Sequence, residues 1–303
     1  MDVKRLAVLN VVGLTRGHLE RPGAMLRLAG RAGRQGVQTF RPSFPAVTST
    51  VQASMLTGRG VEEHGIVGNG WYERESGEVR FWRQGNRLVR GRKVWEALRE
   101  REAGATCANM FWWFNMHSSV DWSVTPRPLY PADGRKVFDV HTHPMGLREE
   151  IKEALGDFPF PAFWGPAAGI ASSKWIAEAA RWIERRERPA LQLVYLPHLD
   201  YGLQKFGPGA AETDAELAAI DEVAGTLAED LEAEGVTVLV VSEYGISEVR
   251  RPVHLNRVLR RRGWLAIKDE LGRDALIPGD SAAFAVADHQ AAHIYVHDPG
   301  ILG

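Results

Sequence analysis

The chain has 303 residues, 45% of them hydrophobic and 25% charged, so it is long enough to bury a substantial core. Its 37 Lys and Arg residues nearly balance its 38 Asp and Glu residues, and the net charge of −1 excludes a global attraction to a nucleic acid polymer or an anionic membrane. The single cysteine, Cys107, excludes an intramolecular disulfide and indicates either a reducing compartment or indifference to redox conditions. The apolar run after Arg5 has only about seven residues, too few for a signal peptide or a membrane span, so we expect a cytoplasmic protein.

Apolar runs alternate with helical periodicities along the chain, which is typical of an α/β fold with a largely parallel central sheet. The expected strands cover residues 6–12, 106–110, 191–196 and 236–241, and the expected helices cover residues 24–34, 94–101, 173–186 and 213–234. Thr213 is expected to cap the last of these helices and Gly235 to end it. Shorter strands follow within 264–286 and at 293–296. We therefore expect a core at 1–250 and a small C-terminal α+β lobe at 251–303.

A hydroxyl group stands at the start of an expected short helix. A Pro-containing extended run leads into Thr48, and one or two helical turns follow before Gly58 closes them. Free backbone N–H groups converge at a helix start, so this position favours an anion. The alternative interpretation is that Thr48 is a plain helix cap.

Polar groups also follow three of the expected strands, in segments 12–15, 197–204 and 242–246. The C-terminal ends of parallel strands face a common crevice. We therefore expect these segments to form one site with Thr48.

The string from Pro45 to Gly58, with Glu-His-Gly-Ile-Val-Gly-Asn at 63–69, resembles the nucleotide pyrophosphatase/phosphodiesterases of the alkaline phosphatase superfamily. The resemblance implies an alkaline phosphatase-like three-layer sandwich, with Thr48 as the nucleophile and Asn69 in contact with a phosphate oxygen. It also implies a divalent metal cofactor (Zn²⁺, Mn²⁺ or Mg²⁺), because a Thr hydroxyl is a poor nucleophile at neutral pH unless it is activated.

The metal-binding motifs of that family are matched incompletely. Asp200 matches the first Asp of the family's Asp-x-x-Gly-His segment, but Gln204 stands at the position of the His. Glu243 keeps a carboxylate where the family has Ser-Asp-His-Gly, whereas Tyr244 replaces the His. Val12 stands where the family has a metal-ligating carboxylate at the end of the first strand.

The candidate metal ligands are therefore Asp200, Glu243 and His198, although the sequence does not fix the direction of the His198 side chain. Oxygen ligands suit Mg²⁺ or Mn²⁺ better than a pair of zinc ions, and one metal ion is easier to justify than two. The alternative is that the two carboxylates only stabilise helix starts. Asn10 shares a strand face with Val12 but is a weak neutral ligand.

The resemblance places a last metal-binding His beyond the small lobe, and this chain stops at Gly303. The turn-like ending favours either a fragment of a longer protein or a shortened relative. Substitutes for that ligand are available in 288–290 and at His293, although His293 heads an apolar run and is more simply a small-lobe residue.

The leading hypothesis is a metal-assisted phosphoesterase that hydrolyses a phosphodiester or pyrophosphate bond in a small-molecule phosphate ester. The alternative is a catalytically degenerate relative that binds anions or nucleotides, or acts as a scaffold. A phosphotransfer or mutase activity through the same Thr is a third option. The oligomeric state is not fixed by the sequence.

Three further clusters of histidine, aromatic and arginine residues have alternative interpretations. His141 and His143 share a face if they lie on a strand, but an exposed pair in a loop is the simpler interpretation. The aromatic run at 111–116 predicts either a stacking platform or core packing. Arg side chains at 83, 87, 90 and 92 could meet a phosphate if their loop folds over the site.

Overall fold

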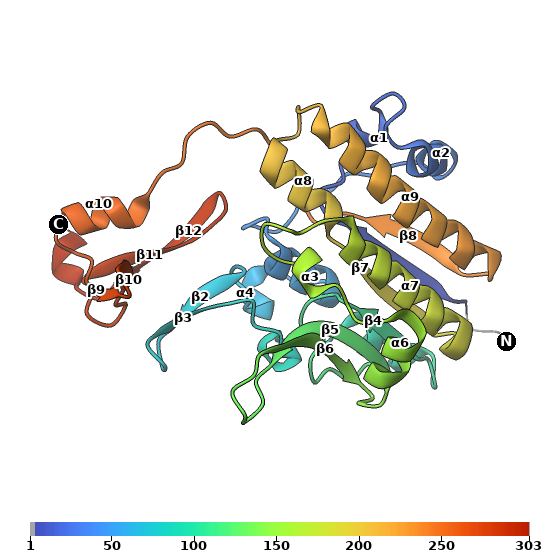
Figure 1. The fold of residues 1–303 in the computed structure, drawn as a ribbon, viewed down its shortest axis with the longest axis horizontal. Coiled ribbons are helices and arrows are strands. Elements are labelled where there is room, and N and C mark those ends of the chain that lie inside the picture. The colour runs from blue at the N-terminus through green and yellow to red at the C-terminus, as the bar shows by residue number, and fades with distance from the viewer. Residues whose placement is uncertain (1–3, 303) are drawn as a thin grey trace.

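A six-stranded sheet with the order β6-β5-β4-β7-β1-β8 forms the centre of the computed structural model, which describes residues 4–302 (Figure 1). Only β6 runs antiparallel to its neighbour. The strands are β1 (Leu6–Val11), β4 (Cys107–Met110), β5 (Trp122–Leu129), β6 (Val137–His143), β7 (Leu191–Leu196) and β8 (Thr237–Val241). The α/β fold with a largely parallel sheet is therefore confirmed.

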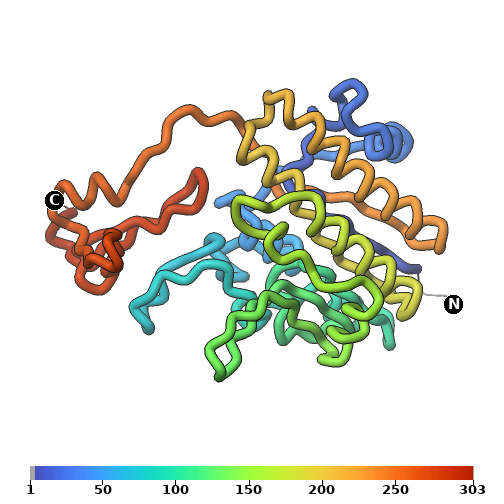
Figure 2. The backbone as a smooth tube through the Cα atoms, viewed as in Figure 1, coloured from blue at the N-terminus to red at the C-terminus, as the bar shows by residue number. Residues whose placement is uncertain are grey.

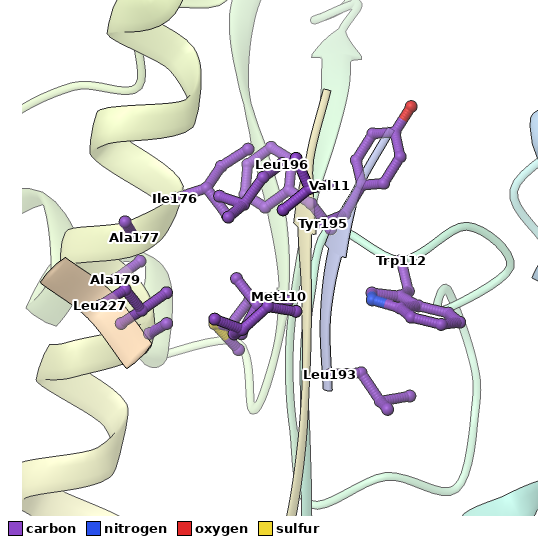
Figure 3. Close-up of a cluster of buried hydrophobic side chains, with 14 of the residues drawn as sticks. Val11, Met110, Trp112, Ile176, Ala177, Ala179, Leu193, Tyr195, Leu196 and Leu227 are labelled. Atoms are coloured by element: carbon purple, nitrogen blue, oxygen red, sulfur yellow. The ribbon is translucent and has the colours of Figure 1, made fainter. Parts of the chain in front are cut away.

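The two faces of the sheet carry different side chains. Leu196 and Val11 point toward the long helices α7 (Ile170–Glu187) and α9 (Glu212–Ala233), whereas Tyr195 and Trp112 lie on the opposite face (Figure 3). Asn10 is paired in register with Tyr195, so it shares this second face. The central strands are buried on both faces, which explains their nearly continuous apolar sequences.

Shorter elements surround the sheet. The remaining helices are α1 (Arg16–Leu19), α2 (Leu26–Gln35), α3 (Thr48–Thr57), α4 (Val61–His64), α5 (Val94–Arg101), α6 (Leu147–Leu155) and α8 (His198–Phe206). A separate hairpin is formed by β2 (Gly70–Glu73) and β3 (Glu78–Phe81), and the 3₁₀ turns are η1 (Asn86–Leu88), η2 (Phe160–Ala162) and η3 (Pro299–Leu302). No helix within residues 4–302 has the length and apolar character needed to cross a bilayer.

A smaller lobe follows residues 242–254, which form no regular helix or strand and run outward from the sheet (Figure 2). This lobe contains α10 (Leu255–Arg261) and the antiparallel pairs β9 (Ile267–Glu270) with β10 (Arg273–Leu276) and β11 (Ala283–Asp288) with β12 (Ala291–Val296). Phe284 and Val286 pack on Tyr72 of β2, so the lobe shares its hydrophobic cluster with the rest of the chain. The division into domains at residue 250 stays a prediction.

Two local predictions are wrong. Thr213 lies inside α9, after the cap residue Ala211, and its hydroxyl donates to the Gly207 carbonyl rather than capping the helix. His141 and His143 lie on β6 and not in a loop, although His143 is exposed. The aromatic run at 111–114 is buried and packs into the core, so it does not form an exposed stacking platform.

Candidate active site

The hydroxyl of Thr48 lies at the first residue of α3. Val47 caps this helix in an extended conformation, and Gly58 ends it with a φ of +65° that favours glycine. Thr48 is only 3% exposed, and its hydroxyl lies 3.3 Å from the Tyr244 hydroxyl. The N–H groups of the first helical turn lack partners within the helix, which makes the helix start beside Thr48 favourable for an anion.

Asn69 is joined to this helix start. Its side-chain Oδ1 accepts a hydrogen bond of 2.9 Å from the Ser49 N–H. The small lobe holds the same residue, because Asp288 at the end of β11 accepts from the Asn69 N–H at 2.6 Å and from its Nδ2 at 3.2 Å. His293 of β12 lies nearby, with Nε2 2.7 Å from the Val67 carbonyl oxygen. The orientation of Asn69 thus depends on a contact between two parts of the chain that are far apart in sequence.

We expect Asp288→Asn to weaken substrate binding. The replacement removes the charged acceptor of the Asn69 N–H and Nδ2 and can place an amide NH₂ group against the Asn69 N–H, so the Asn69 side chain loses its orientation. The Michaelis constant should rise about tenfold with a smaller change in kcat, measured by initial-rate kinetics on any hydrolysed ester. Asp280→Asn changes an exposed small-lobe carboxylate and should leave both constants unchanged. Equal kinetics for the two variants would contradict the positioning of Asn69 by Asp288.

A chain of hydrogen bonds continues from Thr48 to Asp200. The Tyr244 hydroxyl donates to Asp200 Oδ1 at 3.1 Å, and Gln204 Nε2 donates to Asp200 Oδ2 at 2.6 Å. Burial raises the pKa of Asp200, against the hydrogen bond from Tyr244, the nearby His289 and the hydrogen bond from Gln204. Burial raises the pKa of Tyr244 as well, so its hydroxyl stays protonated. Both carboxylate oxygens of Asp200 are therefore occupied by protein donors.

Glu243 follows β8 and is buried beneath Thr48. Its Oε1 accepts from Asn10 Nδ2 at 2.6 Å and from Gln52 Nε2, and Gln52 is oriented by the Trp113 N–H, which donates to its Oε1 at 2.6 Å. Burial raises the pKa of Glu243 to about 8, although hydrogen bonds from Gln52, Asn10 and Thr48 oppose the shift. Among the described residues, Glu243 Oε2 and Asn10 Oδ1 are buried without a hydrogen-bond partner. Unpaired buried oxygen atoms are costly, so this position favours a cation, a proton or a bound water molecule.

His198 does not join this site. The ring Nε2 of His198 lies 2.7 Å from Glu216 Oε2 on α9, but the angles are not those of a hydrogen bond. The backbone N–H of His198 donates to Ser173 Oγ of α7. Burial lowers its pKa to about 4, with a further contribution from Lys174. Across residues 4–302, no three His, Cys, Asp or Glu side chains are grouped as a metal site requires. The structure thus brings Asp200 and Glu243 near Thr48, and it places His198 against α7 and α9.

The donor set fits a single oxygen-liganded cation and not a pair of zinc ions. Glu243 Oε2 and Asn10 Oδ1 are available beside Thr48, and all three are oxygen donors of the kind that Mg²⁺ and Mn²⁺ accept. Val12 contributes no donor atom, and Gln204 and Tyr244 hydrogen bond to Asp200. A second ion lacks the ligands that zinc prefers.

Two contributors were not predicted from the sequence. Gln52 lies in the middle of α3 and was not distinguished from its helical neighbours, although its position one turn after Thr48 was a usable signal. The contact of Asp288 with Asn69 spans 219 residues and has no local sequence signal. The Arg side chains at 87, 90 and 92 do not bond to the residues around Thr48 among the described contacts.

Comparisons with known proteins identify the family and the fold of the chain. The model of the type I phosphodiesterase/nucleotide pyrophosphatase family matches residues 6–301. An uncharacterised pyrophosphatase/phosphodiesterase of Schizosaccharomyces pombe is 26% identical over 228 residues, covering 72% of this chain and 39% of that protein. The chain thus spans well under half the length of this curated relative.

Two solved structures share the fold. Phosphonoacetate hydrolase of Sinorhizobium meliloti, with phosphonoacetate bound, has a TM-score of 0.67 and 18% identity, covering 98% of this chain and 70% of that one. Murine ectonucleotide pyrophosphatase/phosphodiesterase 5, an inactive variant with AMP, has a TM-score of 0.59 and 15% identity, covering 90% and 66% of the two chains. The chain belongs to the type I phosphodiesterase/nucleotide pyrophosphatase family.

Proposed function

We propose that this protein is a phosphoesterase that cleaves a phosphodiester or pyrophosphate bond in a small molecule through Thr48. The observation that carries the proposal is the chain of hydrogen bonds from Thr48 through Tyr244 to Asp200, at a helix start that favours anions. Family membership supports the reaction class, and the bound phosphonoacetate and AMP of the two related structures support a small phosphorus-containing substrate.

Thr48 supplies the nucleophile in this account. The Thr48 oxygen forms a bond to phosphorus while the bond from phosphorus to the leaving oxygen breaks, and the leaving oxygen takes the electron pair and a proton from solvent. The Thr48 proton passes to the Tyr244 oxygen as Tyr244 gives its own proton to Asp200. A water oxygen then bonds to phosphorus as the bond from phosphorus to the Thr48 oxygen breaks. One proton of that water passes to solvent, and Asp200 returns its proton to the Thr48 oxygen by the same route.

The other residues hold the charged oxygens. N–H groups at the start of α3 and the Nδ2 of Asn69 donate to the phosphoryl oxygens. Hydrogen bonds with Asp288 and with the Ser49 N–H keep the Asn69 amide oriented for this contact. Glu243, Asn10 and Thr48 would hold one Mg²⁺ or Mn²⁺ ion. Such an ion lowers the pKa of a bound hydroxyl and neutralises phosphate charge.

The experiment is hydrolysis of bis(p-nitrophenyl) phosphate by metal-free protein resupplied separately with Mg²⁺, Mn²⁺ and Zn²⁺. We expect turnover with Mg²⁺ or Mn²⁺ above that with Zn²⁺. A protein that binds the ester but does not hydrolyse it with any of the ions is instead the degenerate anion-binding relative. The replacement of family ligands by Val12, Gln204 and Tyr244 favours that second function.

Cation binding is expected to strengthen as the pH rises. The pKa of Glu243 is raised to about 8, so below this pH a proton must leave before a cation binds. Calorimetry of Mn²⁺ binding to metal-free protein should show an affinity gain approaching tenfold per pH unit between pH 6 and 8. Glu243→Gln should remove both the affinity and its pH dependence, whereas Glu248→Gln, at an exposed linker position, should behave as the natural protein does. Affinity that is independent of pH would contradict the assignment of Glu243.

A further inference from the structure

A cavity of about 550 Å³ opens between the β2–β3 hairpin and β5. Its lining includes Arg80, Arg83, Arg127, His117, Trp82 and Gln84. Three guanidinium groups thus face a single lining carboxylate, Glu73, which already forms an ion pair with Arg83. The cavity carries excess positive charge.

Arg127 is the guanidinium group that remains free to bind a ligand. Within residues 4–302 it forms no ion pair, whereas Arg80 pairs with Glu78. Its Nη1 donates to Gln84 Oε1 at 3.3 Å. Gln84 is only 6% exposed, and its Nε2 donates to the Pro126 carbonyl at 2.7 Å, which turns Oε1 toward Arg127. A buried amide therefore orients an otherwise unpaired Arg127 side chain at the cavity.

Two histidine rings lie beside Arg127 at this cavity. His117 lies in the lining, with its ring centroid 5.7 Å from that of His141. Burial lowers the pKa of His141, and the neighbouring His117, Arg127 and His143 lower it further. His117, Arg127 and His143 all disfavour a positive charge on His141, and the same surroundings would stabilise an anion placed among them.

The cavity shares a wall with the Thr48 site. The Trp82 N–H donates to the Asn69 carbonyl at 2.8 Å, and the Trp113 ring N–H donates to the Arg83 carbonyl at 2.8 Å. The Trp82 and Trp113 rings pack edge to face, with centroids 5.4 Å apart. Trp113 in turn orients Gln52. The cavity and the residues around Thr48 are therefore connected through Trp82 and Trp113.

We propose that this cavity is a second anion-binding site that takes a dianionic phosphate group on Arg127 and His117. A planar guanidinium group recognises phosphate through paired hydrogen bonds, and its orientation by Gln84 reduces the entropy lost on binding. The phosphate is either a free ion or a separate phosphate group on a longer substrate whose scissile phosphate lies at Thr48. Binding itself does not rest on the proposed hydrolysis, whereas the substrate source does.

The test is calorimetric titration of the full chain with inorganic phosphate and with pyrophosphate, in the presence of a chelator. Arg127→Gln should weaken binding about tenfold or more. Arg135→Gln, which alters an exposed arginine paired with Asp133, should leave binding unchanged. Asn69→Ala disrupts the Thr48 site and should retain the phosphate bound at Arg127. Equal affinities for the Arg127 and Arg135 variants, or loss of all binding in Asn69→Ala alone, would overturn the proposal.

Kinetics distinguish the two sources of the phosphate. If the ligand is part of the substrate, Arg127→Gln raises the Michaelis constant for a phosphodiester that carries a second, separate phosphate group but not for bis(p-nitrophenyl) phosphate, which has one phosphate. If the ligand is free phosphate, the variant loses phosphate binding and keeps both Michaelis constants. A protein without any turnover would refute the proposed hydrolysis and leave the calorimetric result to decide the cavity.

Discussion

Replacing Thr48 with alanine is expected to reduce hydrolysis by about four orders of magnitude, because the variant lacks the oxygen that bonds to phosphorus. Thr48→Ser keeps a hydroxyl at the same helix position and should retain measurable turnover. The Thr48 side chain hydrogen bonds to Tyr244 and does not cap α3, so the alanine variant should fold. Initial rates with a chromogenic diester, together with a thermal melt, check both statements.

Substantial turnover by Thr48→Ala would contradict the role of Thr48. In that case a water molecule would have to attack the phosphorus directly. The alanine variant should still bind substrate, because the helix N–H groups and Asn69 remain in place. Loss of binding in a folded variant would show that Thr48 contributes to ground-state recognition rather than to the chemical step.

Tyr244→Phe is expected to lower kcat by about a hundredfold to a thousandfold with little change in the Michaelis constant. The ring still fills the space, but the hydroxyl that joins Thr48 to Asp200 is gone. The pH–rate profile should also change. In the natural protein, Asp200 must be ionised to accept the proton, so the rate falls at low pH, and this limb should disappear in the variant.

The control for this prediction is Tyr130→Phe, which removes a hydroxyl from a residue that is 68% exposed. It should leave the rate and the pH profile unchanged. If Tyr244→Phe retains the full rate and the acid limb, the proton does not pass through Tyr244. If instead the Michaelis constant alone rises, Tyr244 is a binding residue.

Four of the six strands of the sheet were predicted because their signal is local, whereas β5 and β6 were not, since β5 contains Pro126 and Pro128, which argue against a strand in the sequence. The run at 191–196 is apolar at nearly every position, and the strand boundaries match it, since a strand buried on both faces requires such a sequence. Gly58 likewise identified the end of α3, because its left-handed conformation favours glycine. The alkaline phosphatase-like fold followed from the motif at Thr48 and agrees with the related structures.

The site was predicted less completely because its contacts join distant segments. His198 and Asp200 are neighbours in sequence and share the first turn of α8, but a helix turns successive residues in different directions. His198 therefore packs against Glu216, while Asp200 reaches Tyr244. Spacing in the sequence alone did not fix whether the His198 or the Asp200 side chain would face Thr48.

The structure explains two positions at which this chain departs from the family pattern. Gln204 and Tyr244 replace metal-binding His residues of the family pattern, and both now donate hydrogen bonds to Asp200. Asn10 and Gln52 do the same for Glu243. The carboxylates of the site are thus held by neutral donors, and this arrangement leaves oxygen atoms for one cation at most.

Mass spectrometry of protein quenched in acid during turnover of a phosphodiester with Mn²⁺ shows directly whether Thr48 is the nucleophile. We predict that the phosphoryl part of the substrate is found attached to the peptide that contains Thr48, and that the adduct is absent from Thr48→Ala. Steady turnover without any adduct on that peptide, from quench times that span the first turnover, would contradict the central claim that Thr48 is the nucleophile.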